Sequence, residues 1–118
     1  MRIAFTVLDK EKMIIDESFG RAKLFLVYDT EKDKWEQYEN SQNIKASQGA
    51  GLQAAQTIIN ANVDVLISKN IGPKAFTLLI SQNVKTYSTD EKDVKLALNL
   101  FLDGKLTKME NPNQFGMG

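Results

Sequence analysis

Residues 63–68 read Val-Asp-Val-Leu-Ile-Ser and lie between two stretches with helical periodicity. A short apolar run of this kind is typical of a central strand that helices cover on both sides. The preceding stretch, residues 47–62, predicts a helix with Ser47 as its N-cap and with an inward face formed by Leu52, Ala55, Ile58 and Ile59. The following stretch predicts a second helix that begins near Gly72-Pro73, with an inward face formed by Phe76, Leu79 and Ile80. A helix, a strand and a helix in this order indicate parallel crossover units.

Three more segments before this unit read as strands. Residues 2–8 and 23–29 are apolar on both faces and predict two further central strands. Residues 34–40 are mostly polar, and a short charged link joins them to the preceding strand. Such a link predicts an antiparallel hairpin, and the charges predict that its second strand lies at the edge of the sheet.

The last part of the pattern is a fifth strand followed by a third helix. Residues 84–87 predict the strand, and Thr89 or Asp90 is the expected N-cap of the helix. Gly104 is expected to end this helix. Its apolar stripe at helical spacing consists of Val94, Ala97, Leu98, Phe101 and Leu102.

These elements predict an α/β fold of the order β-β-β-α-β-α-β-α. We expect a three-layer α/β/α sandwich around a five-stranded mixed sheet, with strand order 3-2-1-4-5, one antiparallel strand and ribonuclease-H-like topology. The single domain is expected to span residues 1–105. Residues 106–118 show little pattern and are expected to form a loosely ordered C-terminal tail.

The composition argues against several classes of partner. Lys and Arg together number 15, as do Asp and Glu, so no net field would gather nucleic-acid phosphates or anionic lipid. The apolar runs are far shorter than the roughly 20 residues of a membrane-spanning helix, and the first residues show no apolar region of signal length. We therefore expect no nucleic-acid or membrane partner, and a cytoplasmic location. The chain has no histidine and no cysteine, so neither imidazole nor thiolate can hold a metal.

The candidate site is formed by loops that leave the carboxyl ends of the parallel strands. Ligands of such sheets usually bind where neighbouring connections diverge, here beside residues 2–8 and 63–68. The loops expected there carry Gly49, Gly51, Lys69, Asn70, Gly72 and Lys74. Two helix N-termini would present backbone N–H groups with partial positive charge, which favours an anionic small ligand. The alternative is that the glycines only allow turns and that both lysines are solvated.

Catalysis is not expected from this set of residues. A nuclease of this topology needs carboxylates at one end of the sheet, but Asp9 follows one strand whereas Asp64 begins another. The serines have no histidine to act as a base, and we interpret them as caps and turn residues. Gly49-Ala50-Gly51 lacks the spacing of a phosphate-binding or dinucleotide-binding loop. No catalytic and no metal-ligating residue is assigned.

Four segments in chain order match the pattern of one family. They are Ser18-Phe19-Gly20-Arg21-Ala22 with residues 25–29, Gly49-Ala50-Gly51, residues 63–67, and residues 71–76 leading to 84–87. In these segments the chain resembles the nitrogenase iron-molybdenum cofactor biosynthesis family, which includes NifX-like carriers and NifB carboxyl-terminal domains. The resemblance implies a ribonuclease-H-like sandwich that carries an iron-sulfur or iron-molybdenum cluster precursor without catalysis. It also implies a cluster-assembly protein as a partner.

The same resemblance adds Ser18 and Arg21 to the candidate site. Family members commonly have a histidine where this chain has Ser18, so we do not expect the protein to hold a cluster through a bond of its own. Arg21 offers a planar fork of donors that suits a carboxylate or an oxyanion. The alternative for Arg21 is a structural pair with a neighbouring acid.

Two functions therefore stay open at this point. The first is a noncatalytic binding or carrier protein for an anionic cluster precursor or an oxyanion. The second is a protein-interaction or regulatory module that has kept the fold and lost cofactor binding, and that acts through protein contacts or as a homodimer.

Overall fold

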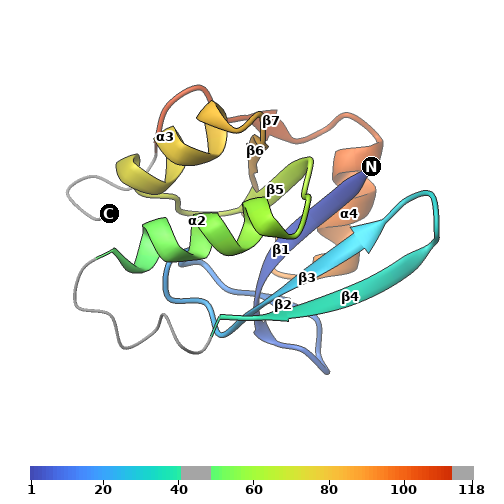
Figure 1. The fold of residues 1–118 in the computed structure, drawn as a ribbon. Helices are drawn as coiled ribbons and strands as arrows, with labels where there is room; N and C mark the ends of the chain where they lie inside the picture. The colour runs from blue at the N-terminus through green and yellow to red at the C-terminus, as the bar shows by residue number, and fades with distance from the viewer. Residues whose placement is uncertain (41–48, 113–118) are drawn as a thin grey trace.

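A computed structural model describes residues 1–40 and 49–112, and its framework is a seven-stranded mixed sheet (Figure 1). The strands along the sheet are β4 (Lys34–Glu39), β3 (Leu24–Asp29), β1 (Arg2–Asp9), β5 (Val65–Ser68), β6 (Lys85–Ser88) and β7 (Thr107–Lys108). A short strand, β2 (Ile14–Ile15), pairs with β1 off this path. β5 is parallel to β1 and β6 is parallel to β5, whereas β3 is antiparallel to both of its neighbours.

The predicted strand order is the order of β4, β3, β1, β5 and β6. The predicted count of five strands is wrong, because β2 and β7 also join the sheet and each adds an antiparallel pair. Both strands have only two residues, which is too short for a period-2 pattern to appear in the sequence. The assignment to the ribonuclease-H-like class stays a prediction.

Three helices pack on the sheet, namely α2 (Ala50–Asn60), α3 (Pro73–Ser81) and α4 (Val94–Leu102). Figure 1 shows α2 and α3 across one face and α4 behind the sheet. Two apolar clusters agree with this arrangement. One joins Leu66 of β5 to Ile58 of α2 and Leu79 of α3. The other joins the neighbouring strand residue Ile67 to Ala97 of α4, as expected when successive side chains point to opposite faces.

The helix N-caps differ from the predicted ones. The N-cap of α4 is Asp93, whose side chain accepts a hydrogen bond from the Leu96 N–H at 3.0 Å. The predicted alternatives, Thr89 and Asp90, precede it, and the Thr89 hydroxyl instead accepts a bond from the Glu91 N–H. Ser47, the predicted cap of the first helix, lies outside the described residues. The described helix α2 has Gly49 as its N-cap.

Some predicted inward positions are exposed. Leu52, Ile80 and Leu102 are 39%, 42% and 54% exposed, because they lie at the margins of their helical stripes. The centres of these stripes, such as Ile58, Leu79 and Ala97, are buried as predicted. Periodicity therefore located each apolar face but not its limits.

The chain after α4 packs back on the sheet. The Met109 N–H donates to the Thr86 carbonyl at 2.8 Å, and the Met109 side chain is buried in the cluster under α2 and α3. Residues 113–118 of the predicted tail lie outside the described residues. None of the helices in the described part of the chain has the length and apolar character needed to cross a membrane.

Candidate functional site

The candidate site lies where β1 and β5 end and where α2 and α3 begin. Figure 1 shows both helices starting at the same end of the molecule. The N-cap of α2 is Gly49, whose φ of 77° is a left-handed conformation that favours glycine. The N-cap of α3 is Gly72, followed by Pro73, which needs no N–H at a first helical position. Among residues 1–40 and 49–112, no side chain caps either helix and no acid lies in either first turn, so no described side chain neutralises the positive helix ends.

The segment around Ser18 runs beside the loop that precedes α3. Ser18 and Asn70 form a parallel bridge. The Asn70 N–H donates to the Glu17 carbonyl at 3.1 Å, and the Phe19 N–H donates to the Asn70 carbonyl at 3.3 Å. Phe19 is 1% exposed and its ring lies 5.6 Å from that of Phe25. The burial of Phe19 therefore fixes the position of Ser18 next to Asn70.

The other side of this segment touches the first turn of α2. A Cβ atom added to Gly20 would lie 3.1 Å from both the Cα and the N atom of Gly51. Only a residue without a side chain fits here without movement of one backbone. Residues 18–20 thus lie between the first turn of α2 and the β5–α3 loop. The structure brings together Ser18, Gly51 and Asn70, which come from three separate parts of the sequence.

The cations predicted for the site lie around this contact. The Lys69 Nζ atom is 3.6 Å from the Glu17 Oε1 atom, and both side chains are partly exposed. Arg21 is exposed and follows Gly20 directly. Lys74 is exposed in the first turn of α3, where it lines a groove described below. The pairing of Lys69 with Glu17 was not foreseen, because nothing in the local sequence links the two residues.

A pair of buried hydroxyls lies beneath the two loops. The Thr6 Oγ1 and Ser68 Oγ atoms are 3.1 Å apart, and neither residue is exposed to solvent. Thr6 Oγ1 also donates to the Asp16 carbonyl at 2.8 Å. The sequence interpretation treated Ser68 as a turn residue and did not foresee its contact with Thr6. The only signal in the sequence is a single hydroxyl residue in each of two mainly apolar strands.

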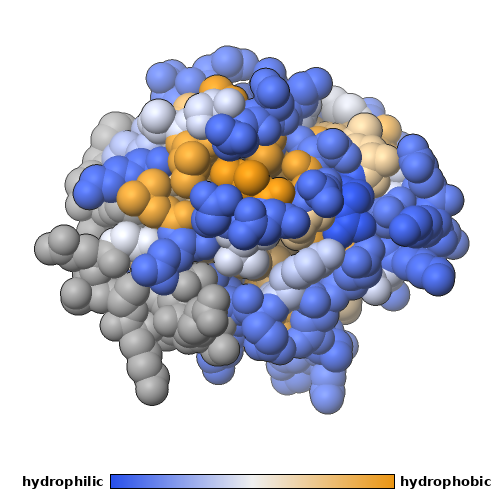
Figure 2. All heavy atoms as spheres, viewed as in Figure 1, coloured by the Kyte–Doolittle hydropathy of each residue, from blue (hydrophilic) through white to orange (hydrophobic). Residues whose placement is uncertain are grey.

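An open apolar groove of about 500 Å³ runs between α2 and α3 from this site. Figure 2 shows hydrophobic residues gathered on the face that carries these two helices. The groove is lined by Leu52, Pro73, Lys74, Thr77, Leu78 and Ser81. The exposed side chain of Leu52, noted above, is therefore part of the apolar lining of this groove.

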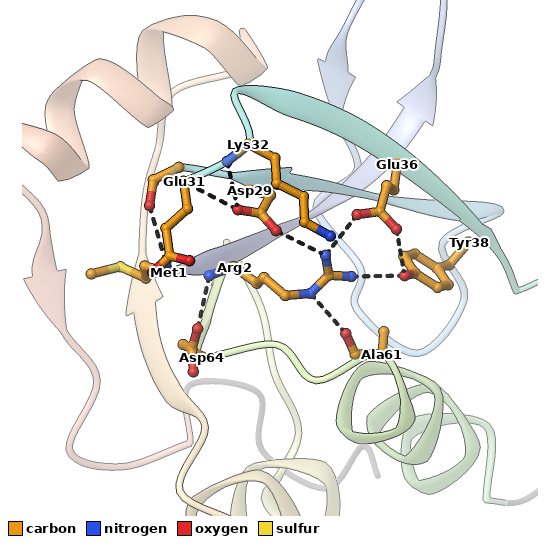
Figure 3. Close-up of polar contacts among 10 residues, drawn as sticks. Met1, Arg2, Asp29, Glu31, Lys32, Glu36, Tyr38, Ala61 and Asp64 are labelled. Atoms are coloured by element: carbon orange, nitrogen blue, oxygen red, sulfur yellow. Dashed lines mark hydrogen bonds and ion pairs between the residues drawn. The ribbon is translucent and has the colours of Figure 1, made fainter.

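The opposite end of the sheet holds a separate polar cluster around Arg2 (Figure 3). The Arg2 guanidinium donates to Glu36 at 2.6 Å, to the Tyr38 hydroxyl at 2.7 Å and to the Ala61 carbonyl at 3.0 Å. The hydrogen bond with Glu36 raises the pKa of Arg2, and the hydrogen bond from Arg2 lowers the pKa of Glu36. These hydrogen bonds join β1 to β4 and to Ala61 at the end of α2. We therefore interpret the cluster as structural.

The donor chemistry of the candidate site suits an anion better than a bare metal ion. The chain has no histidine or cysteine. Within residues 1–40 and 49–112, no three Asp or Glu side chains gather as metal ligands. The groups in this region are backbone N–H groups and the N-termini of α2 and α3, with Lys69 and Lys74 in the adjoining residues, and all of them favour negative charge. Residues of this kind do not fit a metal that is bound directly through the protein.

Comparisons with known proteins agree with this description. The model of the family described as dinitrogenase iron-molybdenum cofactor matches residues 1–104. The chain is 34% identical to the apo form of the orange protein from Desulfovibrio gigas, with a TM-score of 0.91 over 96% of each chain. It is 30% identical to a NifB-like protein from Thermotoga, with a TM-score of 0.83 over 98% of each chain.

A curated relative is similar to this chain in sequence. An uncharacterized protein of Methanocaldococcus jannaschii is 31% identical over 94 residues, which cover 78% of this chain and 80% of the relative. The family match covers most of the chain and includes every residue of the candidate site. This chain therefore belongs to the dinitrogenase iron-molybdenum cofactor family.

Proposed function

We propose that this protein is a noncatalytic carrier that binds an anionic cluster precursor or an oxyanion at the candidate site. The ligand contacts would come from the segment with Ser18 and Arg21, the first turn of α2 with Gly49 and Gly51, and the loop before α3. The family supports a role in iron-molybdenum cofactor biosynthesis. We place this role in the cytoplasm.

One observation carries the proposal. The N-termini of α2 and α3 start at the same end of the molecule, and residues 18–20 are packed between them through Gly51 and Asn70. Several backbone N–H groups and two positive helix ends are thus fixed around one place before any ligand arrives. Such pre-organisation reduces the entropy lost on binding.

The chemistry of the site also indicates what kind of cargo it accepts. Because the chain offers no thiolate or imidazole, the cargo would bring its own sulfide or oxide ligands and present negative charge to the protein. Hydrogen bonds and cations would hold it without a covalent bond. A carrier that binds in this way can release its cargo to a cluster-assembly protein without breaking a metal–protein bond.

Isothermal titration calorimetry with molybdate tests the proposal. We expect binding to the wild-type protein and a loss of about tenfold in affinity for Arg21→Ala, because a charge-assisted hydrogen bond contributes about 1.5–3 kcal/mol. Lys85→Ala is the matched control, since Lys85 is exposed at the start of β6 and its loss removes the same charge from the opposite end of the sheet. Absence of binding to molybdate and to a supplied iron-sulfur precursor would refute the proposal.

A second candidate function is that of a protein-interaction module. The apolar groove between α2 and α3 favours it, because exposed apolar surface of this kind often marks a contact with another protein. Size-exclusion chromatography with light scattering, together with elemental analysis, separates the two candidates. A stable dimer or complex that contains no iron or molybdenum and binds no oxyanion would favour the interaction module.

A further inference from the structure

Beneath the proposed anion site, Thr6 and Ser68 form a hydroxyl pair in a layer that is mostly apolar. Thr6 is two residues from Ala4, and Ser68 is two residues from Leu66, so each hydroxyl shares a face of the sheet with its apolar neighbour. This is the face that α2 and α3 cover. Both residues are fully buried, and their Oγ atoms are 3.1 Å apart. A valine would fill the space of Thr6 and complete the apolar layer. Packing alone therefore does not call for a hydroxyl at this position.

The hydroxyls belong to one continuous hydrogen-bonded path. Thr6 uses its single hydroxyl hydrogen to donate to the Asp16 carbonyl at 2.8 Å, so the shared hydrogen of the pair must come from Ser68. The Asp16 N–H donates back to the Thr6 carbonyl at 2.9 Å. The Asp16 carboxylate then accepts from the Ser18 N–H at 2.9 Å. The path thus runs from Ser68 at the end of β5 through Thr6, within β1, to Ser18.

The two ends of this path are the two loops of the site. Ser68 is the last residue of β5 and directly precedes Lys69 and Asn70. We infer that Thr6 and Ser68 are positioning residues, which hold the Ser18 segment and the β5–α3 loop at the spacing that anion binding needs. This inference rests on the proposed function. It adds two buried residues that cannot touch the ligand but that would set its affinity.

Paired substitutions at Thr6 test this inference. We expect Thr6→Val to lower molybdate affinity at least about fivefold, because both hydrogen bonds of the Thr6 hydroxyl are lost, and we expect Thr6→Ser to restore most of the affinity. Hydrogen exchange should become faster at the Ser18 and Asn70 amides in Thr6→Val but not in Thr6→Ser. These readouts, measured well below each variant's melting temperature, report on loop position and not on overall stability.

Thr86→Val is the matched control. Thr86 is also fully buried, and its register with Leu66 places it on the same face of the sheet. Within the described part of the chain, its hydroxyl has no hydrogen-bond partner. The same substitution should therefore leave both the affinity and the exchange of the two loop amides unchanged.

The outcomes separate this inference from the proposed function. A wild-type protein that binds molybdate, with Thr6→Val equal to it or Thr6→Ser as weak as Thr6→Val, would overturn the positioning role and leave the proposed function standing. A wild-type protein that binds no anion would count against the proposed function, and the exchange rates would still decide the positioning role. If Thr6→Val does not fold, Ser68→Ala takes its place, with the same expected direction.

Discussion

Glu17 places a carboxylate next to Lys69, at the edge of the site that we propose for an anion. The two charged atoms are 3.6 Å apart, and the side chains are 59% and 39% exposed. An incoming anion must share Lys69 with this carboxylate or displace it. We therefore expect Glu17→Gln to raise molybdate affinity about two- to fivefold, since an exposed ion pair is worth about 0.2–1 kcal/mol. Calorimetry at constant ionic strength measures the change.

The control for this prediction is Glu31→Gln. Glu31 is 86% exposed in the β3–β4 turn, at the other end of the sheet, and its change removes the same charge. An equal gain in both variants would show that only net charge matters. A loss of affinity in Glu17→Gln would show that Glu17 supports the site instead of competing for it.

Gly20 carries the contact between the Ser18 segment and α2. A Cβ atom added to Gly20 would lie 3.1 Å from the backbone of Gly51, so a larger residue would fit only if one of the two backbones moved. We expect Gly20→Ala to cost about 1–3 kcal/mol of unfolding free energy, as overpacking usually does, and also to weaken molybdate binding. Urea denaturation and calorimetry measure the two effects.

Gly104→Ala serves as the comparison for Gly20→Ala. Gly104 has a φ of 73° and open space around its Cα, so alanine there is strained but meets no neighbour. It should lose stability without any change in molybdate affinity. If Gly20→Ala keeps wild-type affinity, the close contact with Gly51 is structural only.

The residues of the site differ in how far the sequence could predict them. Gly49, Gly72 and the lysines were identified because glycine and proline mark the ends of strands and the starts of helices. The contact of Glu17 with Lys69 and the contact of Thr6 with Ser68 were not predicted. In each pair the two residues are more than fifty positions apart in the sequence. No local pattern reports such a contact, which exists only once β1 and β5 are paired.

At the scale of elements, Arg2 joins β1 to β4 and to the end of α2. The hydrogen bond from Arg2, followed by the one from Tyr38, lowers the pKa of Glu36 in the folded protein. Stability from this group is therefore present above its unfolded pKa, which is about 4.3 for glutamate, and is lost as the pH falls through the folded value. We expect the free energy of unfolding to fall in acid below about pH 4.

Glu36→Gln checks this prediction. The variant should be less stable than the wild type at pH 7, and the difference should shrink as the pH falls below about 4. Urea denaturation at several pH values measures it. A difference that stays constant down to pH 2.5 would show that the Glu36 charge does not contribute.

The main elements were predictable because each has its own periodicity. The central strands and the apolar faces of the helices follow directly from the alternation and spacing of apolar residues. The N-cap of α4 was not predictable, because Thr89, Asp90 and Asp93 can all cap a helix. Asp93 also forms a bridge with Ile14, a contact between distant parts of the chain that the local sequence does not show. The two short strands were not predictable for another reason. β7, for example, consists of two exposed polar residues, and its pairing with β6 alone makes it a strand.

At the scale of the whole molecule, the two ends of the sheet differ in character. At the end where β1 and β5 finish, residues 18–20 lie between the first turn of α2 and the loop before α3, and no described side chain caps either helix. At the other end, Arg2 and its acidic partners satisfy one another. We therefore assign ligand binding to the end where β1 and β5 finish, and a stabilising role to the end that carries Arg2.

Titration of ¹⁵N-labelled protein with molybdate, followed by two-dimensional NMR, tests this assignment most directly. We predict saturable shifts in the backbone amides of residues 17–21, 49–52, 69–72 and 74, and none at Arg2, Glu36 or Lys85. Absence of shifts at any concentration, or shifts centred on the Arg2 end of the sheet, would contradict it.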